Sequence, residues 1–443
     1  MSERLRNYFR SCPLTTPGEL ADGLGVSRST VLRQIKSLIE QGDVARIGQG
    51  KNTQYLYVKP VADITQPIVL QQINENAQVE VLGKLWITYS GSLLALSDGS
   101  VVEYDDLPWY IFDLKPQGFI GRRIAKRVCK NIKAPAQLDL WTSHDVLRFL
   151  VRFQTDLPGN LQLCLADYLP KTRGTHNTSL QKILDAYDDQ ATKNSVSVHG
   201  QSTAGGEQAK FTSTRRDNDI YKTSLVKYSP NLTVDNPVAV RIRDLLICEH
   251  LALEVLREYN GRASETKLLF SDTRVYLEVS RFDRVVNNNL QGRIGMVSLA
   301  SVIAEYCGYA GDWVEASIDL QKEGLISDDD YRLMHTWLAY SRYIGNSDTH
   351  NGNISLYFND LKIGGLTPAY DMLPMRYMPV AGDVYLPKIV INKPKYIEAD
   401  SWSQGRELGI LFWKRVAADS RTSDEFTELA GQWLAYIAEH EAE

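Results

Sequence analysis

Two aspartates, each in a short polar motif between regular elements, constrain this chain more than any other feature of its sequence. Asp348 lies in the polar stretch 346–353, which ends a helical pattern and leads into a strand. Asp371 follows the short apolar stretch 366–370. With Asn353, the two carboxylates form a set of hard oxygen ligands of the kind that Mg²⁺ prefers. The alternative is that both motifs are ordinary turns, since turns rich in Asn and Asp commonly end helices and strands and have no catalytic role.

The spacing within the first motif favours catalysis. Asp348 and Asn353 are five residues apart, as in the catalytic loop of protein kinases, where the aspartate accepts the proton of the substrate hydroxyl and the asparagine binds a metal ion. Asp371, at the end of a short strand, suits the second metal ligand. His350 between them is better explained as a structural residue that orients the loop.

Upstream of these motifs, a glycine-containing segment, a strand lysine and a helix glutamate follow one another in the same order as in the N-lobe of protein kinases. A polar segment that begins at Asp188 and ends in the glycine-containing stretch 200–206 has the composition of a loop, and it could present backbone N–H groups to phosphate. Lys227 then lies in the strand pattern 221–228, and Glu249 lies on a helix expected over 238–259. In kinases a strand lysine contacts the ATP phosphates and pairs with a helix glutamate. An ordinary flexible loop and a glutamate that faces water are the alternatives.

The first 58 residues predict a DNA-binding module. Helical patterns over 17–24 and 28–41 flank a turn with a glycine, and Ser27 is a suitable N-cap for the second helix. A hairpin follows at 44–58. This order resembles bacterial winged helix-turn-helix domains, in which the second helix enters the major groove. We expect base contacts from Arg28, Ser29, Thr30 and Arg33, and phosphate contacts from Arg46 and from Lys51 at the tip of the wing.

The charge distribution supports this assignment. Residues 1–60 carry nine lysines and arginines against five acidic residues, a net charge of +4, whereas the whole chain carries −5. A basic head on an acidic body indicates that only the head faces a polyanion. The alternative is a small module used only for packing or dimerisation.

Length and composition set the remaining limits. A chain of 443 residues predicts two or three domains. Its five cysteines are widely spaced and form no Cys-x-x-Cys pair, which favours a reducing cytoplasm over a disulfide framework. No stretch approaches the roughly 18 apolar residues of a membrane span, so we expect a cytoplasmic protein without membrane contact.

The two aspartate motifs also resemble those of a known protein family. The stretches 344–353 and 366–371 resemble those of the HipA family of bacterial serine/threonine kinase toxins, and the N-terminal module resembles that of family members with a fused helix-turn-helix. The resemblance covers about residues 70–440. It implies a bilobal kinase-like fold, ATP with Mg²⁺, transfer to serine or threonine of a protein, autophosphorylation, and growth arrest or persistence.

The resemblance also assigns residues. It makes Asp348 the catalytic aspartate, Asn353 and Asp371 the metal ligands, and Lys227 the lysine that binds ATP. It further implies that Glu278 and Ser280 belong to the hinge that contacts the adenine of ATP, and that Gly205 and Gly206 also contact ATP. Ser202, with Thr203 beside it, is the implied site of autophosphorylation. This chain differs from the usual pattern of the family in two respects. The segment between Ser202 and Lys210 is one residue longer than usual, and the DNA-binding module is covalently attached where the family typically uses a separate antitoxin.

We therefore predict an α+β protein with a HipA-like body. The expected domains are a winged helix-turn-helix over 1–60, a small β-containing subdomain over 61–145, a kinase N-lobe over 146–283 and a helical C-lobe over 284–443. The expected partners are ATP, Mg²⁺, a protein substrate and DNA, and a homodimer is compatible with the sequence. Two alternatives remain open: a DNA-binding transcriptional regulator whose body senses nucleotide, and a Mg²⁺-dependent DNA nuclease.

Overall fold

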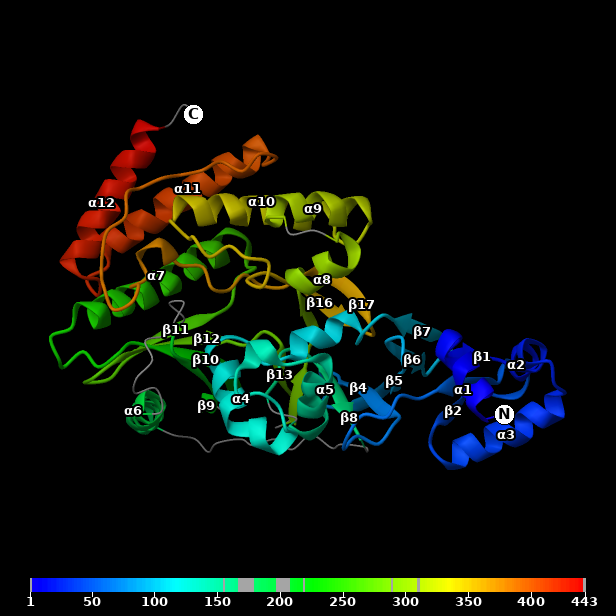
Figure 1. Cartoon of the computed structure of the whole chain (residues 1–443). Coiled ribbons are helices and arrows are strands. Elements are labelled where there is room, and N and C mark those ends of the chain that lie inside the picture. The colour runs from blue at the N-terminus through cyan, green and yellow to red at the C-terminus, as the bar shows by residue number, and fades with distance from the viewer. Residues whose placement is uncertain are drawn as a thin grey trace. The chain divides into compact units, whose positions relative to one another are not determined.

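The protein is built from helices and antiparallel sheets in two units (Figure 1). The computed structural model describes residues 2–153, 156–165, 179–196, 208–217, 220–287, 290–308 and 311–440. One unit consists of Met1–Pro116 with Gly121–Pro170, and the other of Gln117–Ile120 with Lys171–Glu443. The predicted α+β class is confirmed.

The first 58 residues fold as the predicted winged helix-turn-helix. Thr16 and Glu19 form a capping box at the start of the second helix, and Gly25 ends that helix with a left-handed φ of 67°. Ser27 then caps the third helix by accepting the backbone N–H of Thr30. The elements are α1 (Ser2–Ser11), α2 (Pro17–Leu24) and α3 (Arg28–Glu40), with β1 (Leu14–Thr15), β2 (Val44–Ile47) and β3 (Gln54–Tyr57) in the order β1-β3-β2.

A five-stranded antiparallel sheet in the order β7-β6-β5-β4-β8 completes this unit. Its elements are β4 (Ile68–Ile73), β5 (Val79–Ile87), β6 (Ser92–Leu96), β7 (Val101–Tyr104) and β8 (Leu161–Cys164), with the helices α4 (Gly118–Ile132) and α5 (Ser143–Arg152). The subdomain end expected at residue 145 is too early. Residue 145 lies inside α5, and β8 pairs with β4, where Leu163 is opposite Leu70.

Strand β3 of the wing is buried on both of its faces. On one side Tyr55 and Tyr57 join the apolar core of the three helices. On the other side Leu56 and Val58 pack with Trp86 of the five-stranded sheet. A central strand whose alternate side chains enter two cores holds those cores together. The helix-turn-helix is therefore a packed part of this unit.

Leu56→Ala should lower the free energy of unfolding by about 2–5 kcal/mol, because it leaves a cavity where a fully buried leucine joins the wing to the sheet. Urea titration of the full-length protein measures the effect. Leu32→Ala on α3 is the control, since Leu32 is 38% exposed and should cost about 0.5 kcal/mol or less. Equal effects of the two substitutions would show that the wing does not pack on the sheet.

In the second unit, a four-stranded antiparallel sheet in the order β11-β12-β10-β9 lies between two helices. The elements are α6 (Leu180–Val196), β9 (Lys210–Asp217), β10 (Ile220–Tyr228), α7 (Pro237–Asn260), β11 (Thr266–Phe270) and β12 (Val275–Ser280). Tyr187 of α6 packs with Val226 and Tyr276 on one face of the sheet. Leu246 of α7 packs with Leu277 on the other face. The sheet thus presents alternate residues of β12 to different helices.

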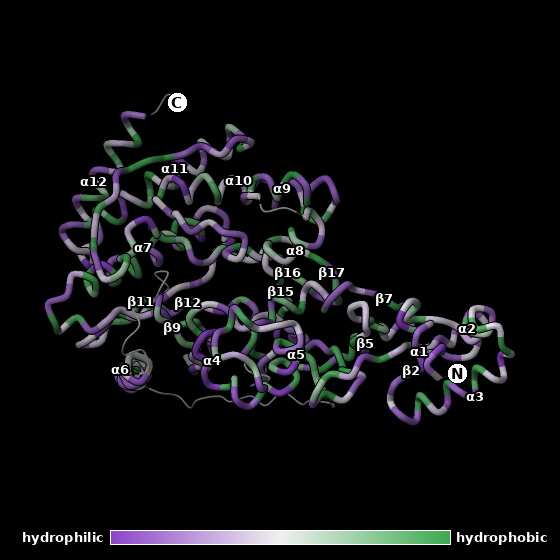
Figure 2. The backbone as a smooth tube through the Cα atoms, viewed as in Figure 1, coloured by the Kyte–Doolittle hydropathy of each residue, from purple (hydrophilic) through white to green (hydrophobic). Residues whose placement is uncertain are grey.

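The remainder of this unit is mainly helical, as predicted. Its elements are β13 (Arg284–Asn287), β14 (Leu290–Arg293), β15 (Met296–Ser298), α8 (Leu299–Tyr306), α9 (Trp313–Lys322), α10 (Asp328–Tyr343), β16 (Ser355–Asn359), β17 (Lys362–Leu366), α11 (Ala399–Ala418) and α12 (Asp424–Glu439). Hydrophobic and hydrophilic residues alternate along α12 (Figure 2), and the apolar ones, such as Phe426 and Trp433, are buried. Among the described residues, no helix is long and apolar enough to cross a membrane.

Candidate active site

A buried lysine lies at the centre of the site. Lys227 projects from β10 on the face that α7 covers, and its side chain is 2% exposed. Its Nζ atom lies 2.5 Å from Oε1 of Glu249, which is fully buried on α7, and it also contacts the carboxylate of Asp371. The possibility that Glu249 faces water is therefore wrong. The fold brings together three charged residues that the sequence places far apart.

Asp371 occupies an unusual backbone conformation. Its φ is 55°, in the left-handed region that residues other than glycine rarely adopt. The preceding segment is fixed on two sides, since the N–H of Thr367 donates to Ser355 O at 3.0 Å and the N–H of Ala369 donates to Arg262 O at 3.0 Å. Such conformations persist only where the surroundings impose them, and they concentrate at functional sites.

The charges of Lys227 and Asp371 stabilise each other. Burial alone would raise the pKa of Asp371, but the ammonium groups of Lys227 and Lys210 outweigh it and hold that pKa below its usual range. Burial would lower the pKa of Lys227, but the carboxylates of Asp371 and Glu249 raise it. Lys227 is therefore a permanent cation and Asp371 a permanent anion at neutral pH.

The loop that carries Asp348 is held by its own hydrogen bonds. The N–H of Asp348 donates to Oδ1 of Asn346 at 3.0 Å, and Nδ2 of Asn353 donates to the carbonyl of Asp348 at 2.8 Å. The imidazole Nδ1 of His350 accepts the N–H of Gly352 at 3.0 Å, in agreement with a structural role for this histidine. The Asp348 side chain remains 46% exposed, 3.8 Å from Nε2 of His350. Its carboxylate is thus accessible while its backbone is fixed.

Lys210 is a second lysine of the site, which the sequence reasoning passed over. It is the register partner of Lys227 on the adjacent strand β9, so both side chains project from the same face of the sheet. Like charges opposite each other are unfavourable unless anions lie close by. Its position directly after the glycine-containing stretch was the available signal. The two lysines suit an anionic ligand such as a chain of phosphates.

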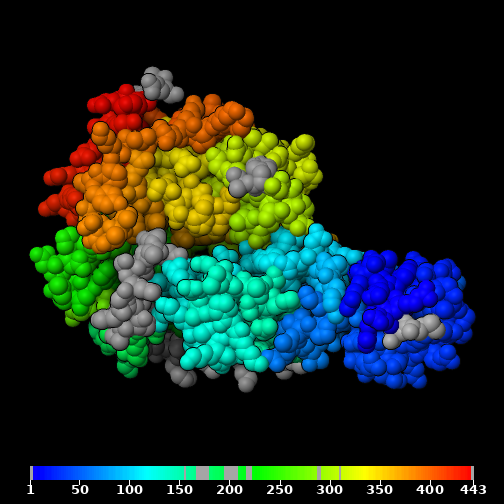
Figure 3. All heavy atoms as spheres, in the orientation of Figure 1, coloured from blue at the N-terminus to red at the C-terminus, as the bar shows by residue number. Residues whose placement is uncertain are grey.

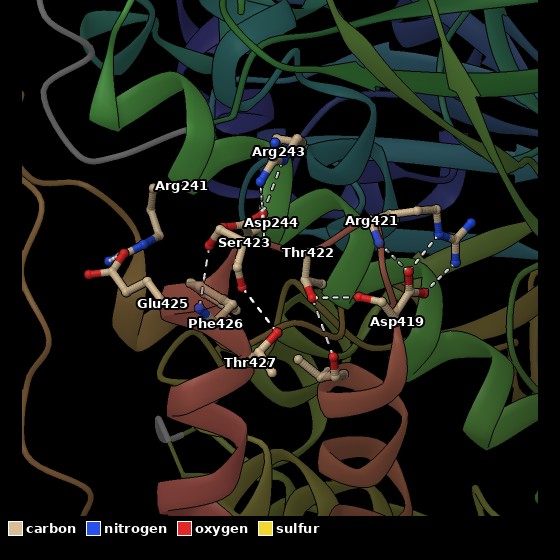
Figure 4. A network of polar contacts seen from close by, with 11 residues as sticks. Arg241, Arg243, Asp244, Asp419, Arg421, Thr422, Ser423, Glu425, Phe426 and Thr427 are labelled. Carbon is tan, nitrogen blue, oxygen red and sulfur yellow. Dashed lines mark hydrogen bonds and ion pairs between the residues drawn. The ribbon is translucent and has the colours of Figure 1, made fainter.

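Helix α7 is held against the C-terminal helices by a second polar network (Figure 4). The fully buried carboxylate of Asp244 accepts the Oγ hydroxyl of Ser423 at 2.5 Å and its N–H at 3.1 Å, at the N-terminus of α12. Arg241, 1% exposed, pairs with Glu425 at 2.8 Å. Its guanidinium also donates to the carbonyl of Tyr377 at 3.1 Å, in the segment that follows Asp371. The helix that carries Glu249 is thereby fixed relative to Asp371.

The residues expected to bind adenine have other contacts. The carboxylate of Glu278 points to the α6 face of the sheet, where Arg215 donates to both of its oxygens at 2.8 and 2.7 Å and Tyr187 donates to Oε1 at 2.7 Å. The N–H of Ser280 donates to Glu265 O at 2.8 Å. The Glu278 side chain is therefore part of the α6 packing, and adenine contact by these two residues stays a prediction.

The remaining predicted residues fall in two groups. Ser202, Thr203, Gly205 and Gly206 lie outside the described residues. In the helix-turn-helix, Arg28, Ser29, Arg33, Arg46 and Lys51 are exposed and Thr30 is half-buried. The hydroxyls of Ser29 and Thr30 each lie 2.9 Å from that of the N-cap Ser27, so they are shared with the helix cap. The exposed cations form a basic surface on α3 and the wing.

The donor chemistry of the site fits a hard cation. Nδ2 of Asn353 is used by the Asp348 carbonyl, which leaves the amide oxygen for another partner, and Asp371 is an ionised carboxylate. Mg²⁺ is usually held by one or two carboxylates together with substrate phosphates. Within the described residues, no three His, Cys, Asp or Glu side chains form a metal-binding cluster on their own. A cation held jointly with a phosphate ligand suits this set.

Three family models match consecutive parts of the chain: winged helix-turn-helix DNA-binding over residues 7–42, YjjJ-like toxin middle domain over 64–169, and HipA-like C-terminal domain over 202–433. Toxin YjjJ of Escherichia coli (strain K12) is 32% identical over 438 residues, covering 97% of this chain and 96% of that protein. A chain from the Shewanella oneidensis MR-1 complex of HipA, HipB and operator DNA matches with a TM-score of 0.51 at 13% identity, covering 83% of this chain and 97% of that chain. This chain therefore belongs to the family of HipA-like toxins, with a winged helix-turn-helix and a YjjJ-like middle domain ahead of the HipA-like body.

Proposed function

We propose that this protein is a serine/threonine protein kinase that uses ATP and Mg²⁺, and that it acts as a growth-arresting toxin. The single observation that carries the proposal is the ion-paired triad of Lys227, Glu249 and Asp371, in which the lysine and the glutamate are buried. A lysine that is paired with a helix glutamate and also lies beside a metal-binding aspartate is the arrangement required for phosphoryl transfer in protein kinases.

Each residue of the site has a separate role in this proposal. Lys227, held by Glu249, neutralises ATP phosphates, and Lys210 adds a second cation on the same face. Asp348 accepts the proton of the acceptor hydroxyl as the new phosphate ester bond forms and ADP leaves. Mg²⁺, when bound by Asp371 and Asn353, offsets the charge of the phosphates. The accessible carboxylate of Asp348 supports its role as the base, because the acceptor hydroxyl must reach it.

Autophosphorylation is part of the proposal. Ser202 is the proposed acceptor, with Thr203 as the neighbouring candidate and Gly205 and Gly206 as contacts of ATP. Helix α6 leads into this segment and β9 leads out of it, and Lys210 begins β9. A hydroxyl in this segment is therefore connected through a short stretch of chain to a cation of the site.

The test is phosphoryl transfer from γ-labelled ATP. The purified full-length protein is incubated with ATP and Mg²⁺ or with ATP and excess chelator, and labelled residues are located by mass spectrometry. We expect label on serine or threonine only with Mg²⁺, and return of transfer when Mg²⁺ is restored. Nucleotide binding without transfer would favour the regulator, and cleavage of DNA that does not need ATP would favour the nuclease.

We also propose that the protein binds duplex DNA through α3 and the wing. The exposed cations Arg28, Arg33, Arg46 and Lys51 carry this second function. Because the wing packs on the five-stranded sheet, DNA bound to α3 would be held by the whole N-terminal unit.

Arg33→Ala should weaken binding to a duplex selected from random sequence by about 1–3 kcal/mol and relax its sequence preference, because a base contact is lost. Lys51→Ala should weaken binding to all duplexes alike and reduce the salt dependence, because a phosphate contact is lost. Fluorescence anisotropy at several salt concentrations measures both. Lys84→Ala, an exposed lysine of the five-stranded sheet, is the control. No selected sequence, or equal effects of all three substitutions, would contradict this assignment.

A further inference from the structure

An exposed segment without regular secondary structure follows the catalytic elements. Residues 384–394 belong to no helix, strand or turn, and the stretch 380–396, here called the 380–396 segment, lies at the surface (orange in Figure 3). No backbone N–H of residues 384–393 donates a hydrogen bond to any residue that the structure describes. Exposed backbone whose N–H donors are unused is suited to pairing with an extended chain.

The segment is fixed from beneath and lies close to the catalytic loop. Arg241 of α7 donates to the carbonyl of Tyr385 at 3.1 Å. Arg376 donates through its guanidinium to the carbonyl of Lys388 at 2.7 Å and through its N–H to the carbonyl of Gly345 at 3.2 Å. Gly345 is three residues before Asp348. One arginine therefore spans the distance between the segment and the start of the catalytic loop.

Apolar side chains are concentrated on this segment. Five of the nineteen large apolar side chains that are exposed in the described part of the chain lie within it: Val380, Tyr385, Leu386, Val390 and Tyr396. Single exposed apolar residues are ordinary, but a group of them on one short stretch indicates an interaction surface.

The segment is also basic on an acidic molecule. It carries three lysines, Lys388, Lys393 and Lys395, against one aspartate, Asp383, whereas the whole chain has a net charge of −5. All three lysines are exposed, and none forms an ion pair with a carboxylate among the described residues. Lys393 and Lys395 instead lie over the rings of Trp402 and Tyr396. The surface is complementary to a chain that is acidic and carries apolar residues.

We propose that the 380–396 segment docks an extended stretch of the phosphate-accepting protein, one in which acidic residues alternate with aliphatic or aromatic ones. The identification of the partner as the phosphate-accepting protein rests on the proposed kinase function. The unpaired backbone would supply the pairing, the exposed apolar residues the contact area, and the three lysines the preference for acidic sequence. Docking there would present a neighbouring serine or threonine to Asp348.

The test is direct binding of peptides. Displayed random linear peptides are selected on the full-length protein, and the selected peptides are titrated against three variants. The first reverses the charge of Lys388, Lys393 and Lys395 by substitution with Glu, and the second is Leu386→Ser with Val390→Ser. The matched control reverses the exposed lysines Lys322, Lys362 and Lys414 of the same unit.

We expect acidic peptides with apolar residues that bind the wild type and the control alike. The triple reversal should weaken binding on the order of tenfold or more, and the apolar double variant should also weaken it. Failure to select peptides, a consensus without acidic residues, or undiminished binding to the triple reversal would overturn the proposal. Competition by random duplex DNA, or a wild-type dimer that the triple reversal dissociates, would overturn it in favour of DNA or a second copy.

The same peptides separate this proposal from the proposed function. Each selected peptide is extended by a serine and incubated with labelled ATP and Mg²⁺. Binding without phosphoryl transfer from the wild type, to the peptide or to the protein itself, would refute the kinase and leave the docking surface intact. Equal transfer by wild type and triple reversal would refute the docking surface and leave the kinase intact.

Discussion

Asp348→Asn should lower the rate of phosphoryl transfer by a factor of about 10²–10⁴ or more, the usual contribution of a positioned general base. Asparagine has nearly the same shape but cannot accept the proton of the acceptor hydroxyl. The contacts that fix the loop use the backbone of Asp348, through the side chains of Asn346 and Asn353, and they remain in the variant. ATP binding and stability should therefore stay close to those of the wild type.

Three measurements check this result. Label transfer gives the rate, titration with ATP gives the affinity, and thermal unfolding gives the stability. Asp329→Asn on α10 is the matched control, since its side chain is 89% exposed and it lies in the same unit. Full transfer by Asp348→Asn would show that another group is the base. Equal losses of transfer and stability would show that Asp348 acts by holding the loop.

Local chemistry was sufficient to predict where several helices begin. Ser27, Asn236 and Ser327 each mark the start of a helix, because short polar side chains cap N-termini in a way that depends only on neighbouring residues. The spacing of Asp348 and Asn353 likewise encodes a loop that closes on itself through a side-chain hydrogen bond.

Contacts between distant segments could not be predicted in this way. The polar stretch that begins at Asp188 reads as a loop, yet α6 continues to Val196. Asp188 explains the difference, since its Oδ1 accepts the hydroxyl of Thr273 at 2.8 Å, in the turn between β11 and β12, and that of Tyr276 at 2.7 Å, on β12. Tertiary hydrogen bonds of this kind override a weak local preference. The buried pair of Arg215 and Glu278 is a further example.

The network at Arg241 shows why the geometry of the site could not be predicted from the sequence. Nothing in the sequence near Arg241 indicates that it joins α7, α12 and the segment after Asp371. An arginine in a helix is usually exposed, whereas here its two terminal nitrogens bind two carbonyls of the segment after Asp371 and one carboxylate of α12. The position of Glu249 relative to Asp371 follows from these long-range contacts, and only the identity of the triad was visible in the sequence.

Lys227→Met should have the largest effect on stability and also stop phosphoryl transfer. Methionine has a similar length but no charge, so Glu249 would be left fully buried without its cation. Removing one partner of a buried ion pair typically costs about 3–5 kcal/mol. Lys222→Met on the same strand is the matched control. Lys222 pairs with Glu265 at 3.2 Å, with side chains 35% and 50% exposed, and such surface pairs contribute about 0–1 kcal/mol.

The loss of stability in Lys227→Met should depend on pH. Burial already raises the pKa of Glu249 in the wild type, and without Lys227 it should rise further. A carboxyl with a higher pKa in the folded state binds its proton more tightly there, so protonation favours folding. The destabilisation should be complete above the folded pKa and should shrink as the pH falls towards the ordinary glutamate value. Urea unfolding at about pH 7 and about pH 5 tests this.

A double substitution separates the two roles of the lysine. Lys227→Met combined with Glu249→Leu removes both buried charges of the pair, and replacing a buried ion pair by apolar residues is often neutral or stabilising. We expect the double variant to regain most of the stability that Lys227→Met loses, to show little pH dependence at this position, and to remain inactive. Recovered stability without recovered transfer would mean that the pair is kept for its contact with phosphate. If the double variant is as unstable as the single one, the loss of stability comes instead from Asp371. The side chain of Asp371 is 26% exposed beside the same lysine.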